Sequence, residues 1–309
     1  MGGTLPADRP AGGHGDRLVM LGVNGGPVIT PQEAQPAIAL VVNGGVYLVD
    51  CGLDTARQLI HSGLGFGGVR NVFITHHHLD HTSGLPGVML HGWTARPALP
   101  SLDIWGPPGA EAKAAKLLAG FDDEIALFAA GGGFGSFPAV TGHDLDLPDD
   151  GAITFVMEDD HVAVTATRVF HGPEVADAYA YRFTVKETGK AVVFSGDTAA
   201  HNANLIALAR DCDVLVHEAQ DNSAIERIAA GLPEPRGAEL IKHLFEAHSS
   251  VLELPAVAHA AGAGKLVLSH YTPMAQPPEA WLAMALPEAT LAGYTGEIIA
   301  PAALDIITL

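Results

Sequence analysis

The chain has 309 residues, of which 48% are hydrophobic and 17% charged. That balance excludes intrinsic disorder, and no apolar run reaches the roughly 18 residues that a membrane-spanning helix needs. Acidic residues outnumber Lys and Arg by 35 to 16, which gives a net charge of −19. Because such a field repels phosphate backbones, it argues against a nucleic-acid partner, and the lack of a spanning run leads us to expect no membrane partner.

Short β-branched runs between Gly and Pro residues predict about eleven strands. They cover residues 17–23, 38–42, 46–49, 72–75, 153–157, 162–170, 179–185, 191–195, 214–217, 265–269 and a last run near 298–307. Ala and Leu at three- and four-residue spacing predict helices at 55–62, 109–120, 203–209, 238–247 and 252–261. Because strands and helices alternate along the whole length, the pattern favours a layered α/β sandwich over two unrelated domains.

The domain organisation follows from the same pattern. We expect residues 1–16, which are rich in Gly and Pro, to form a flexible N-terminus, and residues 17–309 to form one domain. A loop-rich segment at 93–150 is expected near the active-site mouth, where its aromatic residues would either line a substrate pocket or belong to the core. Within it, Gly131–Gly135 is either a connector with positive-φ glycines or a mobile lid.

Two cysteines, Cys51 and Cys212, are too few for a disulfide framework and lack a Cys-x-x-Cys metal spacing, although a single bridge stays open. The N-terminal segment has no cationic start followed by an apolar stretch, so we expect no secretory signal. A cytoplasmic location is the default expectation, and a periplasmic one would apply if a signal peptide had been removed.

The strongest chemical signal is the run Thr75-His76-His77-His78-Leu79-Asp80-His81, directly after a predicted strand. His76, His78, Asp80 and His81 place four candidate metal ligands within six residues, a density that packing does not explain. Imidazole and carboxylate together suit zinc or a similar metal.

Three more candidate ligands, His171, Asp197 and His270, each follow a predicted strand. Since strand-end loops on a rigid scaffold often carry catalytic groups, we expect all seven side chains to meet at one mouth. One metal would take three imidazoles and a second would take Asp80, His81 and His270, with Asp197 as a bridge.

With these motifs the sequence resembles the metallo-β-lactamase-fold hydrolases, in the branch that contains ribonuclease Z and arylsulfatase-like enzymes. The resemblance covers nearly the whole chain, including Met20-Leu21-Gly22-Val23-Asn24-Gly25-Gly26, Asp50 in Tyr47-Leu48-Val49-Asp50-Cys51-Gly52, the His76–His81 cluster, and the motifs around His171, Asp197 and His270. It implies a four-layer αββα sandwich of two mixed β-sheets flanked by helices.

The resemblance also implies roles for the ligands. Two zinc ions per chain are expected, the first on His76, His78 and His171 and the second on Asp80, His81 and His270, with Asp197 bridging. Mn²⁺, Fe²⁺ or Co²⁺ would suit the same donors. Asp50 is expected to support a ligand histidine by a hydrogen bond, whereas by itself it would be a turn-forming residue after a strand.

Two further motifs, His217-Glu218-Ala219 and His248-Ser249-Ser250, resemble those of the ribonuclease Z-like branch. There the glutamate and the second histidine form a pair that protonates a leaving oxygen, so we expect Glu218 to hold His248 charged and aimed. Without the resemblance, Glu218 would be a surface carboxylate at a strand end and His248 a histidine at a helix C-terminus.

The substrate expectation comes from a departure from the pattern. Ribonuclease Z enzymes usually hold tRNA with a long arm, which the bacterial type inserts between the third and fourth motifs, but only 25 residues lie between His171 and Asp197. We therefore expect a dinuclear zinc hydrolase that acts on a small ester, namely an aryl or alkyl sulfate or a phosphodiester. The attacking group would be a metal-bridging hydroxide that Asp80 orients.

Four alternatives stay open at this point. One is a ribonuclease Z-like tRNA 3′-endonuclease, the second a lactamase- or lactonase-type hydrolase, and the third a non-catalytic metal-binding protein. The fourth concerns assembly, because a homodimer is as compatible with the sequence as a monomer.

Overall fold

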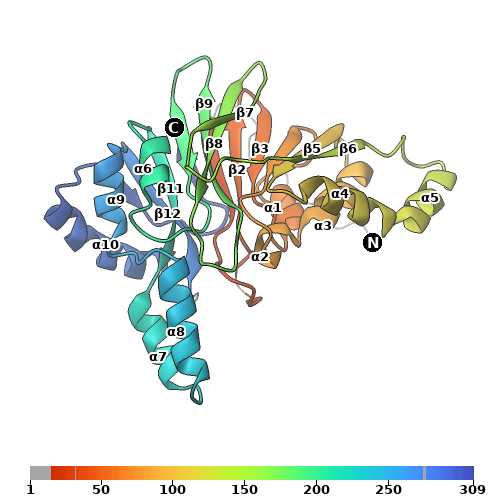
Figure 1. Cartoon of the computed structure of the whole chain (residues 1–309). Coiled ribbons are helices and arrows are strands. Elements are labelled where there is room, and N and C mark those ends of the chain that lie inside the picture. Colours follow the sequence, from red (N-terminus) through yellow and green to blue (C-terminus); the bar gives the residue numbers. More distant parts are fainter. Residues whose placement is uncertain (1–14, 32, 274–275) are drawn as a thin grey trace.

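The computed structural model describes residues 15–31, 33–273 and 276–309. Two mixed β-sheets of seven strands pack face to face, and helices flank both of them (Figure 1). The predicted four-layer αββα sandwich is therefore confirmed. Most of the predicted flexible N-terminus lies outside the described residues, and the division into that segment and one domain stays a prediction.

The first sheet is built mainly from the N-terminal half of the chain. Its strands, in spatial order, are β14 (Ile306–Thr308), β1 (Arg17–Gly22), β2 (Ala37–Val42), β3 (Gly45–Val49), β4 (Val69–Phe73), β5 (Ser101–Gly106) and β6 (Ala139–Asp144). The helices of this half are α1 (Thr55–His61), α2 (Leu79–Thr82), α3 (Leu85–Thr94), α4 (Ala110–Ala119) and α5 (Asp122–Ala130). Helix α4 packs on β5 and β6, and α1 packs on α3 and β1.

The second sheet belongs to the C-terminal half. Its order is β13 (Glu297–Ile299), β12 (Lys265–Thr272), β11 (Val214–Gln220), β10 (Ala191–Phe194), β9 (Ala178–Val185), β8 (Val162–Val169) and β7 (Thr154–Glu158). The remaining helices are α6 (Ala203–Leu208), α7 (Asn222–Ala230), α8 (Arg236–Ala247), α9 (Leu254–Ala261) and α10 (Pro278–Ala292). Helices α6, α9 and α10 pack on this sheet, whereas α7 and α8 form a hairpin that projects from the body (Figure 1).

Side chains that alternate along the strands build two hydrophobic layers. In β1, Leu18 and Met20 belong to the core between the sheets, while Val19 and Leu21 belong to the core under the first-sheet helices. Because successive strand residues point to opposite faces, a continuous apolar run such as this one is buried on both sides. The strand is therefore internal to the sandwich.

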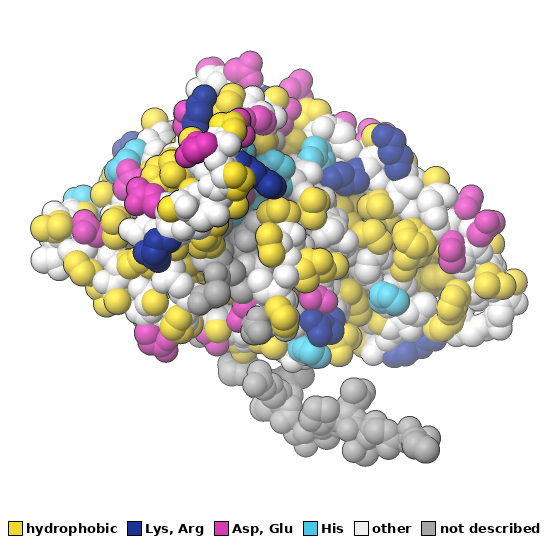
Figure 2. All heavy atoms as spheres, turned by 90° about the horizontal axis from the view of Figure 1, so that it is seen from below, with side chains coloured by type: hydrophobic (Ala, Val, Ile, Leu, Met, Phe, Trp, Pro, Cys, Tyr) yellow, Lys and Arg dark blue, Asp and Glu magenta, His cyan; other side chains and the backbone are white. Residues whose placement is uncertain are grey.

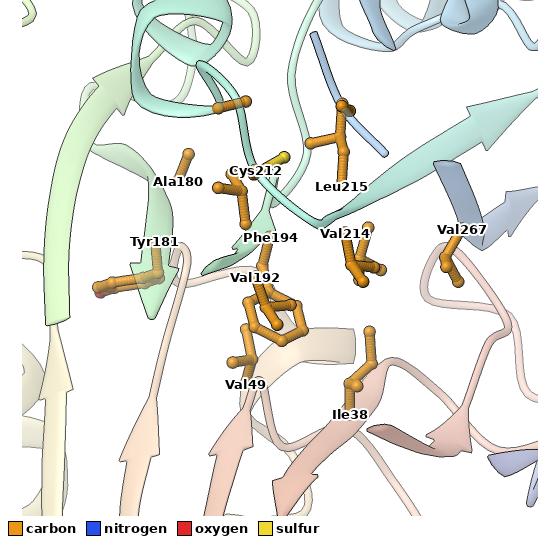
Figure 3. Packing of buried hydrophobic residues seen from close by; sticks show 14 of the residues in the cluster. Ile38, Val49, Ala180, Tyr181, Val192, Phe194, Cys212, Val214, Leu215 and Val267 are labelled. Carbon is orange, nitrogen blue, oxygen red and sulfur yellow. The ribbon is translucent and has the colours of Figure 1, made fainter. Parts of the chain in front are cut away.

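The core between the sheets is the larger of the two layers. Ile38 and Val49 from the first sheet meet Val192 and Phe194 from the second (Figure 3). Nearby, the ring of Phe73 lies edge-on to Phe183 at 4.9 Å between centroids. These contacts hold β4 against the second sheet, and β4 leads directly into the histidine cluster.

The structure corrects the prediction of a loop-rich segment at 93–150. The segment contains β5, β6 and α5 in addition to the helix predicted at 109–120. Strand β5 has alternating burial, with Leu102 and Ile104 buried, but it lies between prolines and has few β-branched residues, which is why the sequence pattern missed it. The single strand expected near 298–307 is instead two short strands, β13 and β14, in different sheets.

The glycine stretch at 131–135 lies beside an aromatic cluster. The indole Nε1 of Trp93 donates to the Gly135 carbonyl oxygen at 2.9 Å, and its ring lies 5.8 Å from Phe134 and 5.1 Å from Phe137. A lid role for this stretch stays a prediction. In the part of the chain that is described, no helix is long and apolar enough to cross a membrane, and the cellular compartment also stays a prediction.

Candidate metal centre

The seven side chains predicted as metal ligands form overlapping groups whose ligand atoms lie close together. Helix α2, which carries Asp80 and His81, lies where strands of both sheets end (Figure 1). Two sets of three offer ligand atoms that all lie within 4.8 Å of one another: His76, His78 and His171 in one set, and Asp80, His81 and His270 in the other. These are the two sets that the resemblance implied. All of them are buried except His78, whose side chain is exposed.

Asp197 lies between the two sets. Its Oδ2 atom is 3.1 Å from Nε2 of His270 and 3.4 Å from Nε2 of His81. On the other side, the same oxygen is 3.7 Å from Nε2 of His171 and 3.8 Å from Nε2 of His76. One carboxylate oxygen therefore faces both groups, as a bridging ligand would.

The donor atoms fit a divalent cation. Nε2 of His81 lies 3.2 Å from Nε2 of His270, and Nε2 of His171 lies 3.3 Å from Nδ1 of His78. Two imidazole nitrogens on one tetrahedral zinc ion are separated by about 3.3 Å, given Zn–N distances of roughly 2.0–2.1 Å. The buried Nε2 of His76 has no hydrogen-bond partner among the described residues. A metal ion would supply the missing partner for these nitrogens.

Backbone contacts hold α2, which carries Asp80 and His81, against the turn that follows β3. The Cys51 N–H donates to the His81 carbonyl oxygen, and the Gly84 N–H donates to the Cys51 carbonyl oxygen, both at 2.8 Å. The Asp80 carboxylate accepts from the Gly26 N–H at 2.9 Å. The ligand helix is thus fixed by backbone atoms from two distant loops.

Asp50 has the contacts expected of a group that orients a ligand. Its Oδ2 atom lies 2.8 Å from Nδ1 of His81, and its Oδ1 atom accepts from the Thr75 N–H at 2.8 Å. A carboxylate at Nδ1 keeps the proton there and leaves Nε2 free to bind a metal. Asp50 has a φ of 58°, a left-handed conformation that is costly for a residue with a side chain.

His270 occupies a bulge in β12. In the pairing of β11 with β12, Glu218 lies opposite Ser269 and Ala219 lies opposite Tyr271. His270 is therefore an extra residue in β12 without a partner in β11. Its φ is 46°. A bulge releases one residue from the sheet ladder and redirects its side chain. Here it turns the imidazole of His270 toward Asp197.

Burial and charge shift the pKa values of the centre in opposite directions. Burial alone would raise the pKa of Asp197, but His270 and His81 outweigh it and hold that pKa well below its usual range. Burial lowers the pKa of His171 to about 4 and that of His76 well below its normal value. The carboxylate is therefore ionised and these two imidazoles are neutral, which are the forms that bind metal.

The structure brings the predicted Glu218/His248 pair together beside the centre. Nδ1 of His248 lies 2.8 Å from Oε2 of Glu218, and Oε1 of Glu218 accepts from the Thr198 N–H at 2.9 Å. Burial would lower the pKa of His248, but the charge of Glu218 outweighs it and raises that pKa to about 9. The His248 ring is 4.8 Å from that of His171. A charged imidazole is thus held next to the candidate ligands.

A cavity of about 670 Å³ opens beside this centre. The loop at 24–30, the start of α2 and the α7–α8 hairpin form its walls, and none of the described residues that line it lies in the segment 93–150. Sequence reasoning missed α7 and hence this cavity. The signal was present, because Ile225 and Ile228, and likewise Leu240 and Leu244, are apolar at helical spacing.

Comparison with known proteins decides the family. The family model described as "Beta-lactamase superfamily domain" matches residues 46–271. The chain belongs to this superfamily. It is 34% identical over 277 residues to a ribonuclease Z of Mycolicibacterium paratuberculosis, covering 88% of this chain and 92% of that protein. It is 30% identical over 282 residues to a ribonuclease Z of Mycobacterium bovis, with the same coverage.

A solved structure supports the superfamily fold. The short form of human tRNase Z superposes with a TM-score of 0.64 at 21% sequence identity, covering 94% of this chain and 98% of that one. The expected membership of the metallo-β-lactamase fold, on the side of ribonuclease Z, is therefore confirmed. The protein is a hydrolase of this superfamily, and an arylsulfatase-like activity finds no support.

Two expectations were wrong. The main prediction of a small sulfate or phosphodiester ester as substrate is contradicted, because relatives that match nearly the whole chain are named ribonuclease Z. The expectation of no nucleic-acid partner is contradicted by the same relatives. The net charge of −19 misled because it describes the mean field of the whole molecule, whereas divalent cations bound at the candidate centre would make the site itself attractive to phosphate.

Proposed function

We propose that this protein is a metal-dependent endonuclease that cleaves precursor tRNA at its 3′ end. The observation that carries the proposal is the combination of a full donor set for two cations with the Glu218/His248 pair, in a chain 34% identical to a ribonuclease Z over nearly its whole length. A donor set alone would serve many hydrolases of this fold. The pair and the relatives favour RNA.

The metal ligands belong to the proposal. His76, His78 and His171 would hold one ion, Asp80, His81 and His270 a second, and Asp197 would contact both. Zinc is the first candidate, with Mn²⁺, Fe²⁺ and Co²⁺ as alternatives for the same donors. Bound cations would supply charge that polarises the phosphoryl group and lowers the pKa of water.

The protein's own groups then position the reactants and move one proton. Asp80, fixed by the Gly26 N–H, orients the attacking water. As the water oxygen bonds to phosphorus, the water releases one proton to solvent, and the bond from phosphorus to the leaving nucleoside oxygen breaks. His248, held protonated by Glu218, donates its proton to that oxygen. Asp50 keeps the ring of His81 in place throughout.

The test is cleavage of a precursor tRNA transcript by the purified chain at low salt, together with elemental analysis of the same preparation. We expect a single cut at the 3′ end and two metal equivalents per chain. Asp197→Asn should lose both metal and cleavage, while its expression and secondary structure stay unchanged. A metal-replete protein that leaves the transcript intact would refute the proposal.

A further inference from the structure

The cavity beside the metal centre is apolar along most of its walls. Val28 and Leu79 contribute one side, and the α7–α8 hairpin contributes the other through Ile225, Ile228, Leu240 and Leu244. His248 and His270 line the same cavity, so it is continuous with the reaction centre. Its volume of about 670 Å³ lies in the range of sites for small organic groups.

Several of these apolar residues are exposed. Val28 is 71% exposed, Leu79 58% and Ile228 47%. A group of large apolar side chains that meets at the surface beside a catalytic centre marks a binding site rather than ordinary surface composition. A ligand bound in this cavity would be stabilised mainly by the burial of this apolar surface.

Apart from its histidines, among them His248 and His270 at the metal centre, the described lining of the cavity offers no basic side chain to hold a phosphate. None of the described residues that line it is Lys or Arg, and its acidic members are Asp80 and Asp197 at the metal centre. On the face of the molecule seen from below, Lys and Arg side chains lie apart from one another rather than in one patch (Figure 2). Away from the metal centre an RNA backbone would find little attraction there, so the part of an RNA that fits against the apolar walls is an uncharged one.

We propose that this cavity binds the nucleobase of the nucleotide on the leaving-oxygen side of the scissile phosphate, an inference that rests on the proposed function. His248 both lines the cavity and would protonate the leaving oxygen, so the nucleoside that carries this oxygen is the one beside the cavity. Single-stranded RNA ends present unstacked bases, which proteins bind by stacking and apolar contact. The imidazoles of His243 and His248 and the aliphatic hairpin residues supply such surfaces.

The first arm of the test changes the substrate only. Three precursor tRNAs are compared with the wild-type protein: an intact one, one with an abasic residue on the leaving-oxygen side of the cut, and one with an abasic residue on the opposite side. We expect kcat/KM to fall at least about fivefold for the first abasic substrate, mainly through KM, because one base contact is lost. The second abasic substrate should stay within about twofold of the intact RNA.

The second arm changes the cavity. Ile228→Ala and Leu240→Ala together should lower kcat/KM for the intact RNA by a similar factor and have little effect on the RNA that lacks the base. Leu291→Ala on α10, where the side chain is 79% exposed, is the matched control and should change neither value. Metal content should be equal in all three proteins.

The outcomes separate the two proposals. If the substrate without the base on the leaving-oxygen side is cut as efficiently as the intact RNA, the cavity does not bind that base, although the cleavage itself supports the endonuclease. If the metal-replete wild-type protein cuts none of the RNAs, both proposals fall. Additive losses from the abasic substrate and the double variant would also overturn the cavity proposal, since the two changes should remove one and the same contact.

Discussion

Two carboxylates behind the centre each lie 2.8 Å from the Nδ1 atom of a histidine. Asp50 contacts His81, and Nε2 of His81 faces Asp197. Glu218 contacts His248, which is not one of the seven predicted ligands but lies beside them. The same contact thus serves two purposes. At His81 it would direct a lone pair toward a bound metal, and at His248 it stabilises the protonated ring.

The Glu218/His248 pair gives a prediction at this scale. Glu218→Gln keeps the shape of the side chain but removes the charge that raises the pKa of His248. We expect kcat for precursor tRNA to fall by about 10²- to 10⁴-fold, the usual contribution of a positioned proton donor, with KM and metal content nearly unchanged. Single-turnover cleavage and elemental analysis provide the measurement.

A surface pair supplies the control for that experiment. Glu253 lies 3.6 Å from His201, and both side chains are about half exposed. Glu253→Gln should leave kcat at the wild-type value because an exposed pair of this kind is weak and neither residue lines the cavity beside the metal centre. Wild-type kcat in Glu218→Gln would exclude the assigned role, and a loss of metal would show that Glu218 supports the ligands instead.

At the scale of elements, the short helix α2 depends on close backbone contacts for its position. A Cβ atom on Gly84 would overlap the Gly52 carbonyl oxygen, and a Cβ atom on Gly52 would overlap the Asp80 carbonyl oxygen. Only glycine allows the turn after β3 to approach the ligand helix so closely. The separation between Asp50 and His81 is therefore set by two residues that carry no functional group.

Gly84→Ala tests this dependence. The added methyl group must push α2 away from the turn, so we expect the metal-free protein to lose about 1–3 kcal/mol of stability in urea unfolding. Metal affinity, measured by competition with a chelator, should fall at the same time. Gly87→Ala is the control, because a Cβ there meets only Ala56 at 3.4 Å and should leave stability unchanged or raise it by about 0.5–1 kcal/mol. Unchanged metal affinity in Gly84→Ala would contradict the argument.

At the scale of the whole molecule, the centre joins the two sheets. His76 follows β4 of the first sheet, and His81 lies in α2 just beyond it. His171 and Asp197 follow strands of the second sheet, and His270 lies within β12 of that sheet. Bound cations would link side chains from both sheets. Because they would bind only the folded state, they should stabilise the whole sandwich. Free metal at 100 times its dissociation constant would add about 2.7 kcal/mol.

Metal removal should therefore lower the thermal midpoint. We expect dialysis against a chelator to reduce Tm, and added zinc to restore it, with the difference growing with free zinc concentration. Asp197→Asn, which lacks the shared ligand, should show a smaller difference between the chelated and zinc-loaded states. Equal Tm values for the chelated and metal-replete wild-type protein would show that the cluster does not bind a cation under those conditions.

The sequence alone predicted a layered α/β sandwich and the candidate ligands because their signals are local. His76 to His81 lie within six residues, and the other ligands each follow an apolar run that is typical of a strand. The contacts Asp50–His81 and Glu218–His248 were expected from the resemblance, but their geometry depends on strands that pair across long sequence separations. Net charge, which is a sum over all residues, gave a wrong prediction about RNA.

Periodicity and motif density thus predicted the layered α/β class and the candidate ligands, since each is a property of a few neighbours along the chain. Only the tertiary structure decided where those residues meet. It placed Asp197 between two ligand groups, released His270 from its ladder by a bulge, and set the α7–α8 hairpin over an apolar cavity. Such distances arise from the packing of two sheets and from close contacts at Gly52 and Gly84, and no local pattern encodes them.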